Sequence, residues 1–117
     1  MEKMMTQPIP DNIEILNLLP RLQDPDAGVR RIALIDLADL EDAEALPWLT
    51  QALITDVNSD VRREAANLLE GWQDADVVEA LCTALTDVDE AVAGAAAHSL
   101  CQLKTTSLGN IILHWVE

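Results

Sequence analysis

Apolar residues recur along the chain in helical stripes, and the stripes repeat about every 32 residues, a period typical of repeat proteins. One column of this pattern is Val29, Val61 and Val92. The columns that run parallel to it are Ala33, Ala65 and Ala96; Leu37, Leu69 and Leu100; and Leu40, Trp72 and Leu103. Within each copy these positions fall at i, i+4, i+8 and i+11, which is one face of an amphipathic helix. We call the three helices that this predicts the second helices.

A matching apolar stripe precedes each second helix and predicts a first helix in every copy. Its positions are Ile15, Leu18 and Leu22; Leu46, Leu49 and Leu53; and Val78, Leu81 and Leu85. A short polar turn separates the two helices of each copy. Asp26, Asn58 and Asp89 stand in these turns, where a side-chain oxygen can accept from a free N–H at the start of the second helix.

The complete pattern predicts an all-α protein of seven helices with no β-strand. The expected helices are 12–23, 27–40, 43–54, 58–72, 75–86, 89–103 and 107–116. One helix pair cannot bury its own stripe, so successive pairs must stack into an α-α superhelix. We therefore expect a flexible segment at residues 1–11 and one repeat domain at 12–117.

Two residues disturb the pattern. Pro20 lies inside the first predicted helix, where it loses the bond to the Leu16 carbonyl and should kink or shorten the helix. Gly94 lies inside the second helix of the third copy and should weaken that helix by about 1 kcal/mol. The third repeat is therefore expected to be the least stable.

The turns themselves carry a recurring motif. "DPDAGVRRIALIDL" begins at Asp24 and "DVNSDVRREAANLL" begins at Asp56. Asp followed by Val-Arg-Arg and an Ala-Leu run resembles the HEAT family, specifically its short phycobilisome-lyase-type repeats. The resemblance implies a hydrogen-bonded ladder between neighbouring repeats, with the members Asp24, Arg30, Asp56, Arg62 and Asp87. In the third copy, Ala93 and Gly94 replace the two arginines, so the ladder lacks a basic residue there.

Acidic residues dominate the charge of the chain. Lys and Arg number 7 against 21 Asp and Glu, which gives a net charge of −14. Such a chain repels nucleic acid. Solubility and helix capping account for much of the acidity, and a basic protein partner is the other interpretation. No apolar stretch reaches the roughly 18 residues of a membrane span, and no signal peptide is evident, so we expect a cytoplasmic protein that does not contact membranes.

Catalytic and metal-binding patterns are scarce, and we expect no cofactor. "DVNSD" begins like a calcium loop but has Val61 where Gly is required and Asn67 where Glu is required. His98 and Cys101 stand three apart and Cys82 lies on the partner helix, yet ordinary packing fits these residues better than a metal site. The tryptophans lie in or beside the apolar stripes and are expected to fill the core; they are Trp48, Trp72 and Trp115.

The register predicts which residues of the second helices face outward. This candidate partner-binding strip, on the concave face of the solenoid, consists of Arg31, Ile35, Arg63, Asn67 and His98. An exposed Ile35 beside two arginines favours binding of a protein or peptide. The alternative is that the arginines pair with nearby acids such as Asp60 and Glu64.

The C-terminal segment "SLGNIILHWVE" matches the first helix of a fourth copy that has no second helix. Ile111 and Trp115 are expected on its outer side, where uncovered apolar residues mark an association site. Three alternatives remain open: a two-fold contact that makes a homodimer, cover by residues outside this sequence, or a simple cap whose large residues point inward.

Two classes of function fit these features. The first is a non-enzymatic interaction module or accessory scaffold that binds a protein or peptide. The second follows from the resemblance alone and is a subunit of a phycobilin-lyase-like enzyme that handles a tetrapyrrole chromophore.

Overall fold

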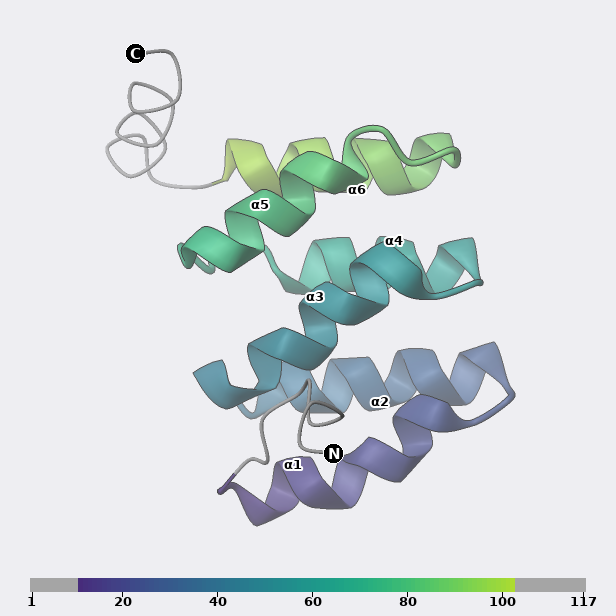
Figure 1. The fold of residues 1–117 in the computed structure, drawn as a ribbon, viewed down its shortest axis with the longest axis vertical. Helices are drawn as coiled ribbons and strands as arrows, with labels where there is room; N and C mark the ends of the chain where they lie inside the picture. Colours follow the sequence, from purple (N-terminus) through teal and green to yellow (C-terminus); the bar gives the residue numbers. More distant parts are fainter. Residues whose placement is uncertain (1–10, 103–117) are drawn as a thin grey trace, which may run out of the picture.

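The computed structural model describes residues 11–102, and within this range the chain is a stack of helices without strands (Figure 1). These described residues form six α-helices and two short 3₁₀ helices. They are α1 (Ile13–Leu18), η2 (Leu19–Gln23), α2 (Ala27–Asp39), η3 (Ala43–Ala45), α3 (Leu46–Thr55), α4 (Ser59–Leu68), α5 (Ala75–Ala84) and α6 (Glu90–Cys101). The all-α prediction is confirmed. The seventh predicted helix, at 107–116, lies outside the described residues.

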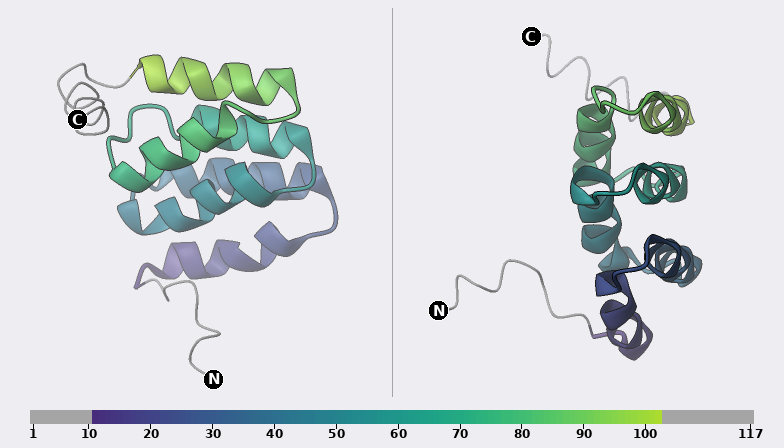
Figure 2. Two further views of the ribbon diagram at one scale, coloured as in Figure 1. Left: turned by 45° about the horizontal axis from the view of Figure 1, so that its top comes forward. Right: turned by 90° about the vertical axis from the view of Figure 1, so that its right-hand side faces the viewer.

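The helices form two layers, with first helices α1, α3 and α5 in one and second helices α2, α4 and α6 in the other (Figure 2). Helix α4 packs on both α2 and α6, and α3 packs on both α4 and α5. Each repeat therefore buries its apolar stripe against its own partner helix and against the neighbouring repeat. This is the arrangement of an α-α superhelix.

Polar caps start the second helices as the sequence predicted. Asp26 accepts a hydrogen bond from the backbone N–H of Gly28 at 2.7 Å, ahead of α2. Asn58 and Asp89 cap α4 and α6 in the same way, and each accepts from two backbone N–H groups. Asn12 and Asp74 cap the first helices α1 and α5, and Asp42 caps η3, which leads into α3.

Helix ends depart from the predicted bounds for identifiable reasons. Pro20 ends α1 at Leu18, and the chain continues as η2, which confirms the predicted shortening. Helix α4 ends at Leu68, four residues earlier than predicted. The backbone leaves α4 in short 3₁₀-type turns and reaches Gly71, whose φ of 92° suits glycine and cannot continue a helix.

The core contains most of the predicted columns and also Leu34 and Val77, which the columns did not include. The largest fully buried apolar side chains are Ile15, Leu34, Leu37, Leu49, Leu53, Leu69, Leu81, Val61, Val77 and Val92. Leu85 was expected in the stripe of α5, but it lies at the C-cap of that helix and is 43% exposed. Trp48 is buried and Trp72 packs half-buried against the core, so both fill space between helices as predicted.

Candidate functional site

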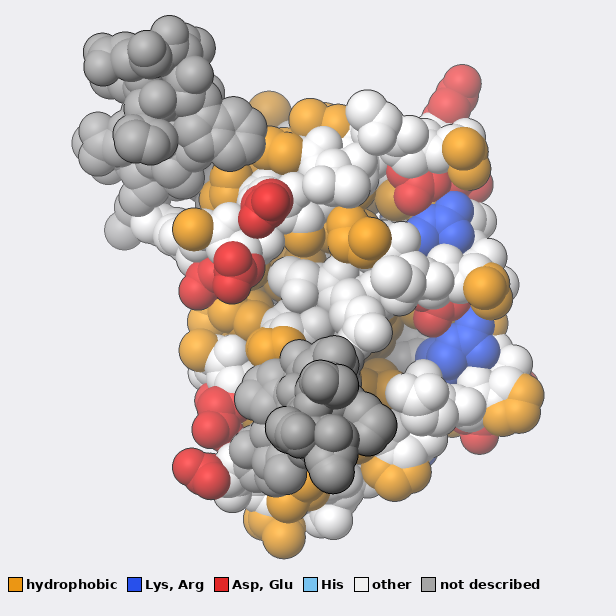
Figure 3. Space-filling model, viewed as in Figure 1, with side chains coloured by type: hydrophobic (Ala, Val, Ile, Leu, Met, Phe, Trp, Pro, Cys, Tyr) orange, Lys and Arg blue, Asp and Glu red, His pale blue; other side chains and the backbone are white. Residues whose placement is uncertain are grey.

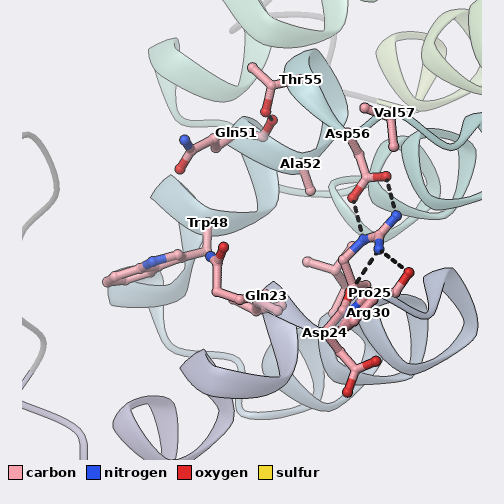
Figure 4. A pocket seen from close by; sticks show the side chains of 12 residues that line it. Gln23, Asp24, Pro25, Arg30, Trp48, Gln51, Ala52, Thr55, Asp56 and Val57 are labelled. Carbon is pink, nitrogen blue, oxygen red and sulfur yellow. Dashed lines mark hydrogen bonds and ion pairs between the residues drawn. The ribbon is translucent and has the colours of Figure 1, made fainter.

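Arg30 connects the first repeat to the second. Its Nε and Nη2 donate to the two carboxylate oxygens of Asp56, each at 3.0 Å, and its Nη1 donates to the Asp24 carbonyl oxygen at 2.8 Å (Figure 4). The guanidinium therefore joins the turn of its own repeat to the turn of the next. The paired planar geometry is the strong form of an Arg–carboxylate contact.

Arg62 makes the same contacts one repeat further on. It donates to both Asp87 oxygens at 2.9 and 3.1 Å and to the Asp56 carbonyl oxygen at 2.7 Å. The Arg62 and Asp87 side chains are only 13% and 12% exposed, so water screens this pair weakly. In Figure 3 the Lys and Arg side chains of the visible face gather against Asp and Glu along the edge where these turns stack.

The ladder fixes the charge states of its members. The hydrogen bonds from Arg62 lower the pKa of Asp87, and the Asp89 backbone N–H adds to this effect, while desolvation opposes it. In return, hydrogen bonds to Asp56 and Asp87 raise the pKa values of Arg30 and Arg62, respectively. Arg30, Arg62 and Asp87 are therefore charged at neutral pH.

The adjacent arginines Arg31 and Arg63 differ sharply from Arg30 and Arg62 in exposure. Their side chains are 43% and 41% exposed. Arg31 donates from Nε to Glu64 on α4 at 2.9 Å, and Arg63 lies 3.7 Å from Asp60 on its own helix. A hollow of about 210 Å³ at the first turns of α2 and α4 has both arginines in its lining.

The remaining residues of the predicted strip occupy different environments. Asn67 and His98 are exposed, and His98 Nε2 lies 3.9 Å from the Glu70 carboxylate. The expectation of an exposed Ile35 was wrong, because this side chain is half-buried. Ile32, one turn earlier on α2, is the exposed isoleucine.

The cavity between the first two repeats was not anticipated from the sequence. It has a volume of about 550 Å³, and the Arg30–Asp56 pair forms part of its wall together with residues of η2, α2 and α3 (Figure 4). Gln23, Gln51 and Thr55 supply further polar groups to its lining. The sequence hinted at this cluster of polar groups only through the equal separation of Asp24 from Arg30 and of Asp56 from Arg62.

A buried hydroxyl was also missed. Ser99 is fully buried in α6, and its Oγ donates to the Ala66 carbonyl oxygen of α4 at 2.7 Å. The bond ties α4 to α6, the second helices of the same two repeats that the Arg62–Asp87 pair connects. A lone serine in an Ala-rich helix gave no sequence signal for this contact.

The candidate metal and thiol residues do not converge. Cys82 is half-buried, Cys101 is exposed, and both are free thiols. The oxygen-bearing residues of "DVNSD" are used elsewhere: Asp56 accepts from Arg30 and Asn58 caps α4. Between residues 11 and 102, no group of three or more His, Cys, Asp or Glu is placed to hold a metal ion.

The predicted association residues Ile111 and Trp115 lie outside the described residues, as do residues 1–10 of the expected flexible segment. Within the described part, no helix is both long and apolar enough to cross a membrane.

The sequence profile of HEAT repeats matches residues 15–101 of the chain. The match covers the three helix pairs described above, and the chain therefore belongs to the HEAT-repeat family. It does not distinguish the phycobilisome-lyase subtype from other HEAT repeats. A search of curated proteins found no match to the chain.

Proposed function

We propose that the protein is a non-enzymatic interaction module that binds a protein or peptide across the outward face of α2, α4 and α6. HEAT repeats in general mediate protein–protein interaction or scaffolding. The observation that carries the proposal is the contrast between neighbouring arginines. Arg30 and Arg62 form the ladder pairs with Asp56 and Asp87. Arg31 and Arg63 are partly exposed to solvent and line the same hollow.

The energetics of the outer pairs support a binding role. Solvent-exposed ion pairs contribute only about 0–1 kcal/mol to folding, so Arg31 and Arg63 are not needed to hold the repeats together. Their guanidinium groups can exchange a carboxylate of this chain for one of a partner at little cost. Asn67 and His98 continue the strip with exposed hydrogen-bonding groups on α4 and α6.

We propose that the partner combines two features. The net charge of −14 favours a partner that is basic overall, because opposite net charges speed encounter. Between Arg31 and Arg63, the same partner would place a carboxylate or another hydrogen-bond acceptor. The domain that presents this surface would be residues 12–117 as a unit, with the protein acting in the cytoplasm.

Reversal of both outer charges tests the proposal. Partners captured by the wild-type chain from its source cells would be identified, purified and titrated against the Arg31→Glu, Arg63→Glu variant. We expect loss of binding with unchanged helical circular dichroism. The control is the Glu79→Lys variant, which alters charge on the exposed side of α5 in the opposite layer. Equal binding by the wild type and the double variant would place the site elsewhere.

The tetrapyrrole alternative makes a different prediction in a simpler assay. A lyase-like subunit would shift the visible absorbance of a free bilin on titration, whereas a module that binds only protein would leave the spectrum unchanged. A saturable spectral shift would favour the alternative.

A further inference from the structure

The turn at Asp24 has the same construction as the two turns that accept an arginine. In each, the Asp Oδ1 accepts a hydrogen bond from the backbone N–H two residues later, which fixes the carboxylate. The three bonds are Asp26 to Asp24 at 2.8 Å, Asn58 to Asp56 at 2.9 Å and Asp89 to Asp87 at 2.8 Å. The Asp24 turn therefore has the same local geometry as the two turns whose aspartates accept an arginine in the ladder.

Asp24 differs from the other two in what it receives. Asp56 and Asp87 each accept two hydrogen bonds from an arginine of the preceding repeat. Among the contacts of residues 11–102, the Asp24 carboxylate accepts only from the Asp26 backbone. Figure 4 shows this carboxylate pointing away from the Arg30–Asp56 pair. A fixed acceptor for an arginine therefore stands open at the α1 end of the stack.

Exposed apolar side chains lie on α1 and α2, the helices that form this end of the stack. Ile13 and Leu16 of α1 are 65% and 37% exposed, and Ile32 of α2 is 47% exposed. The register shows which way Ile32 faces. Its counterpart in α4 is Glu64, which reaches back to Arg31 of the preceding helix, so this column faces the preceding repeat. No described helix lies beyond α1 and α2 at this end (Figure 1).

This end of the stack is therefore built like an internal surface. A terminal repeat normally has a polar outer face, because uncovered apolar residues lower solubility. Here Ile13, Leu16 and Ile32 are exposed on α1 and α2, and the turn that leads into α2 holds an acceptor already oriented for a guanidinium. We call these residues and Asp24 the α1-end face.

We propose that the α1-end face docks a helical layer of another protein, which supplies an arginine to Asp24. The two internal pairs define the chemistry, since a planar guanidinium donates to both carboxylate oxygens whereas a lysine offers a single point charge. The net charge of −14 favours a cationic partner. A second copy stacked head to tail does not supply the arginine, because Ala93 stands at the Arg30 and Arg62 position in the third repeat.

A helix from the chain itself provides a defined probe. In the stack, α4 presents Arg62 to Asp87 and packs against α6, which is the next second helix. A hydrocarbon-stapled peptide of residues 58–72 would present the same face to Asp24 and α2. We would titrate the labelled peptide with the full chain and follow fluorescence anisotropy.

The expected result is saturable binding that weakens about tenfold or more when Asp24→Asn removes one carboxylate. An Arg62→Ala peptide should bind the wild-type chain with an affinity that is lower by a similar factor. The Asp24→Asn chain should bind the Arg62→Ala peptide and the unmodified peptide with equal affinity. The control is Asp76→Asn, which removes the same charge from an exposed position on α5.

Several results would overturn the proposal. One is the absence of saturable binding. Another is an equal loss of affinity in Asp24→Asn and Asp76→Asn, which would indicate only general electrostatic attraction. A dimer in sedimentation that Asp24→Asn dissociates would assign the face to a second copy. Binding that appears only after removal of residues 1–10 would assign it to the chain's own N-terminal segment.

Discussion

Arg62 and Asp87 share two hydrogen bonds, from Nε at 2.9 Å and from Nη2 at 3.1 Å, although 24 residues separate them in the chain. Hydrogen bonds to charged groups contribute about 1.5–3 kcal/mol each when one partner is removed. Arg62→Ala should therefore lower the free energy of unfolding by at least about 1.5 kcal/mol in urea denaturation. The matched control is Arg63→Ala, next in sequence but exposed, which should cost less than about 1 kcal/mol. Equal losses would mean that the ladder does not stabilise the stack.

The same pair should make stability depend on acid. Because Arg62 lowers the pKa of Asp87 in the folded state, the pair stabilises the fold above the unfolded-state pKa of about 3.9. That contribution is lost as the pH falls through the lower, folded-state pKa. In urea denaturation, the free energy of unfolding should fall less between pH 7 and pH 3 for Asp87→Asn than for the wild type. The variant should already be less stable than the wild type at pH 7. Parallel profiles would contradict the prediction.

Leu69 is fully buried at the C-terminus of α4, in the centre of the stack. Leu69→Ala should cost about 2–5 kcal/mol, because the lost methyl groups leave a cavity among packed helices. The comparison is Leu85→Ala, at a position that the sequence pattern also places in an apolar stripe but the structure exposes. That variant should change the thermal midpoint much less.

Two glycines should respond in opposite directions to replacement by alanine. A Cβ at Gly94 would have no neighbour within 4 Å and the residue lies within α6, so Gly94→Ala should stabilise the protein by up to about 1 kcal/mol. Gly71 has equal space but a φ of 92°, and Gly71→Ala should destabilise by about 1–2 kcal/mol. Thermal unfolding of both variants checks the pair, and a loss of stability at Gly94 would refute its assignment as a weak point of the third repeat.

Local spacing was enough to predict most of the fold. The caps at Asp26, Asn58 and Asp89 and the stripes of the helices depend on contacts within a few residues, so periodicity reveals them. The end of α4 was harder to predict from the sequence, because Leu69 and Trp72 still fit the apolar stripe. Only the positive φ at Gly71 shows where the helix stops.

Exposure on the second helices could not be read from one helix alone. Ile32 and Ile35 lie one turn apart, and which of them is exposed depends on how far each repeat is rotated against the next. Similarly, Arg31 reaches across to α4 whereas Arg63 turns to its own helix, although both hold the same place in the repeat. The exposure of the isoleucines thus depends on the packing between repeats. The difference between the two arginines follows from the sequence, because Ala95 stands in α6 where Glu64 stands in α4.

The ladder has a direction, since every described rung runs from an arginine to the aspartate of the following repeat. This polarity decides how the array could be lengthened. A duplicated second repeat would bring its own Asp56 and Arg62, so it would accept from the repeat before it and donate to the one after it. A duplicated third repeat would bring Ala93 and would leave the aspartate of its successor unmatched. Arrays grown from this chain by duplication are therefore expected to multiply the central repeat.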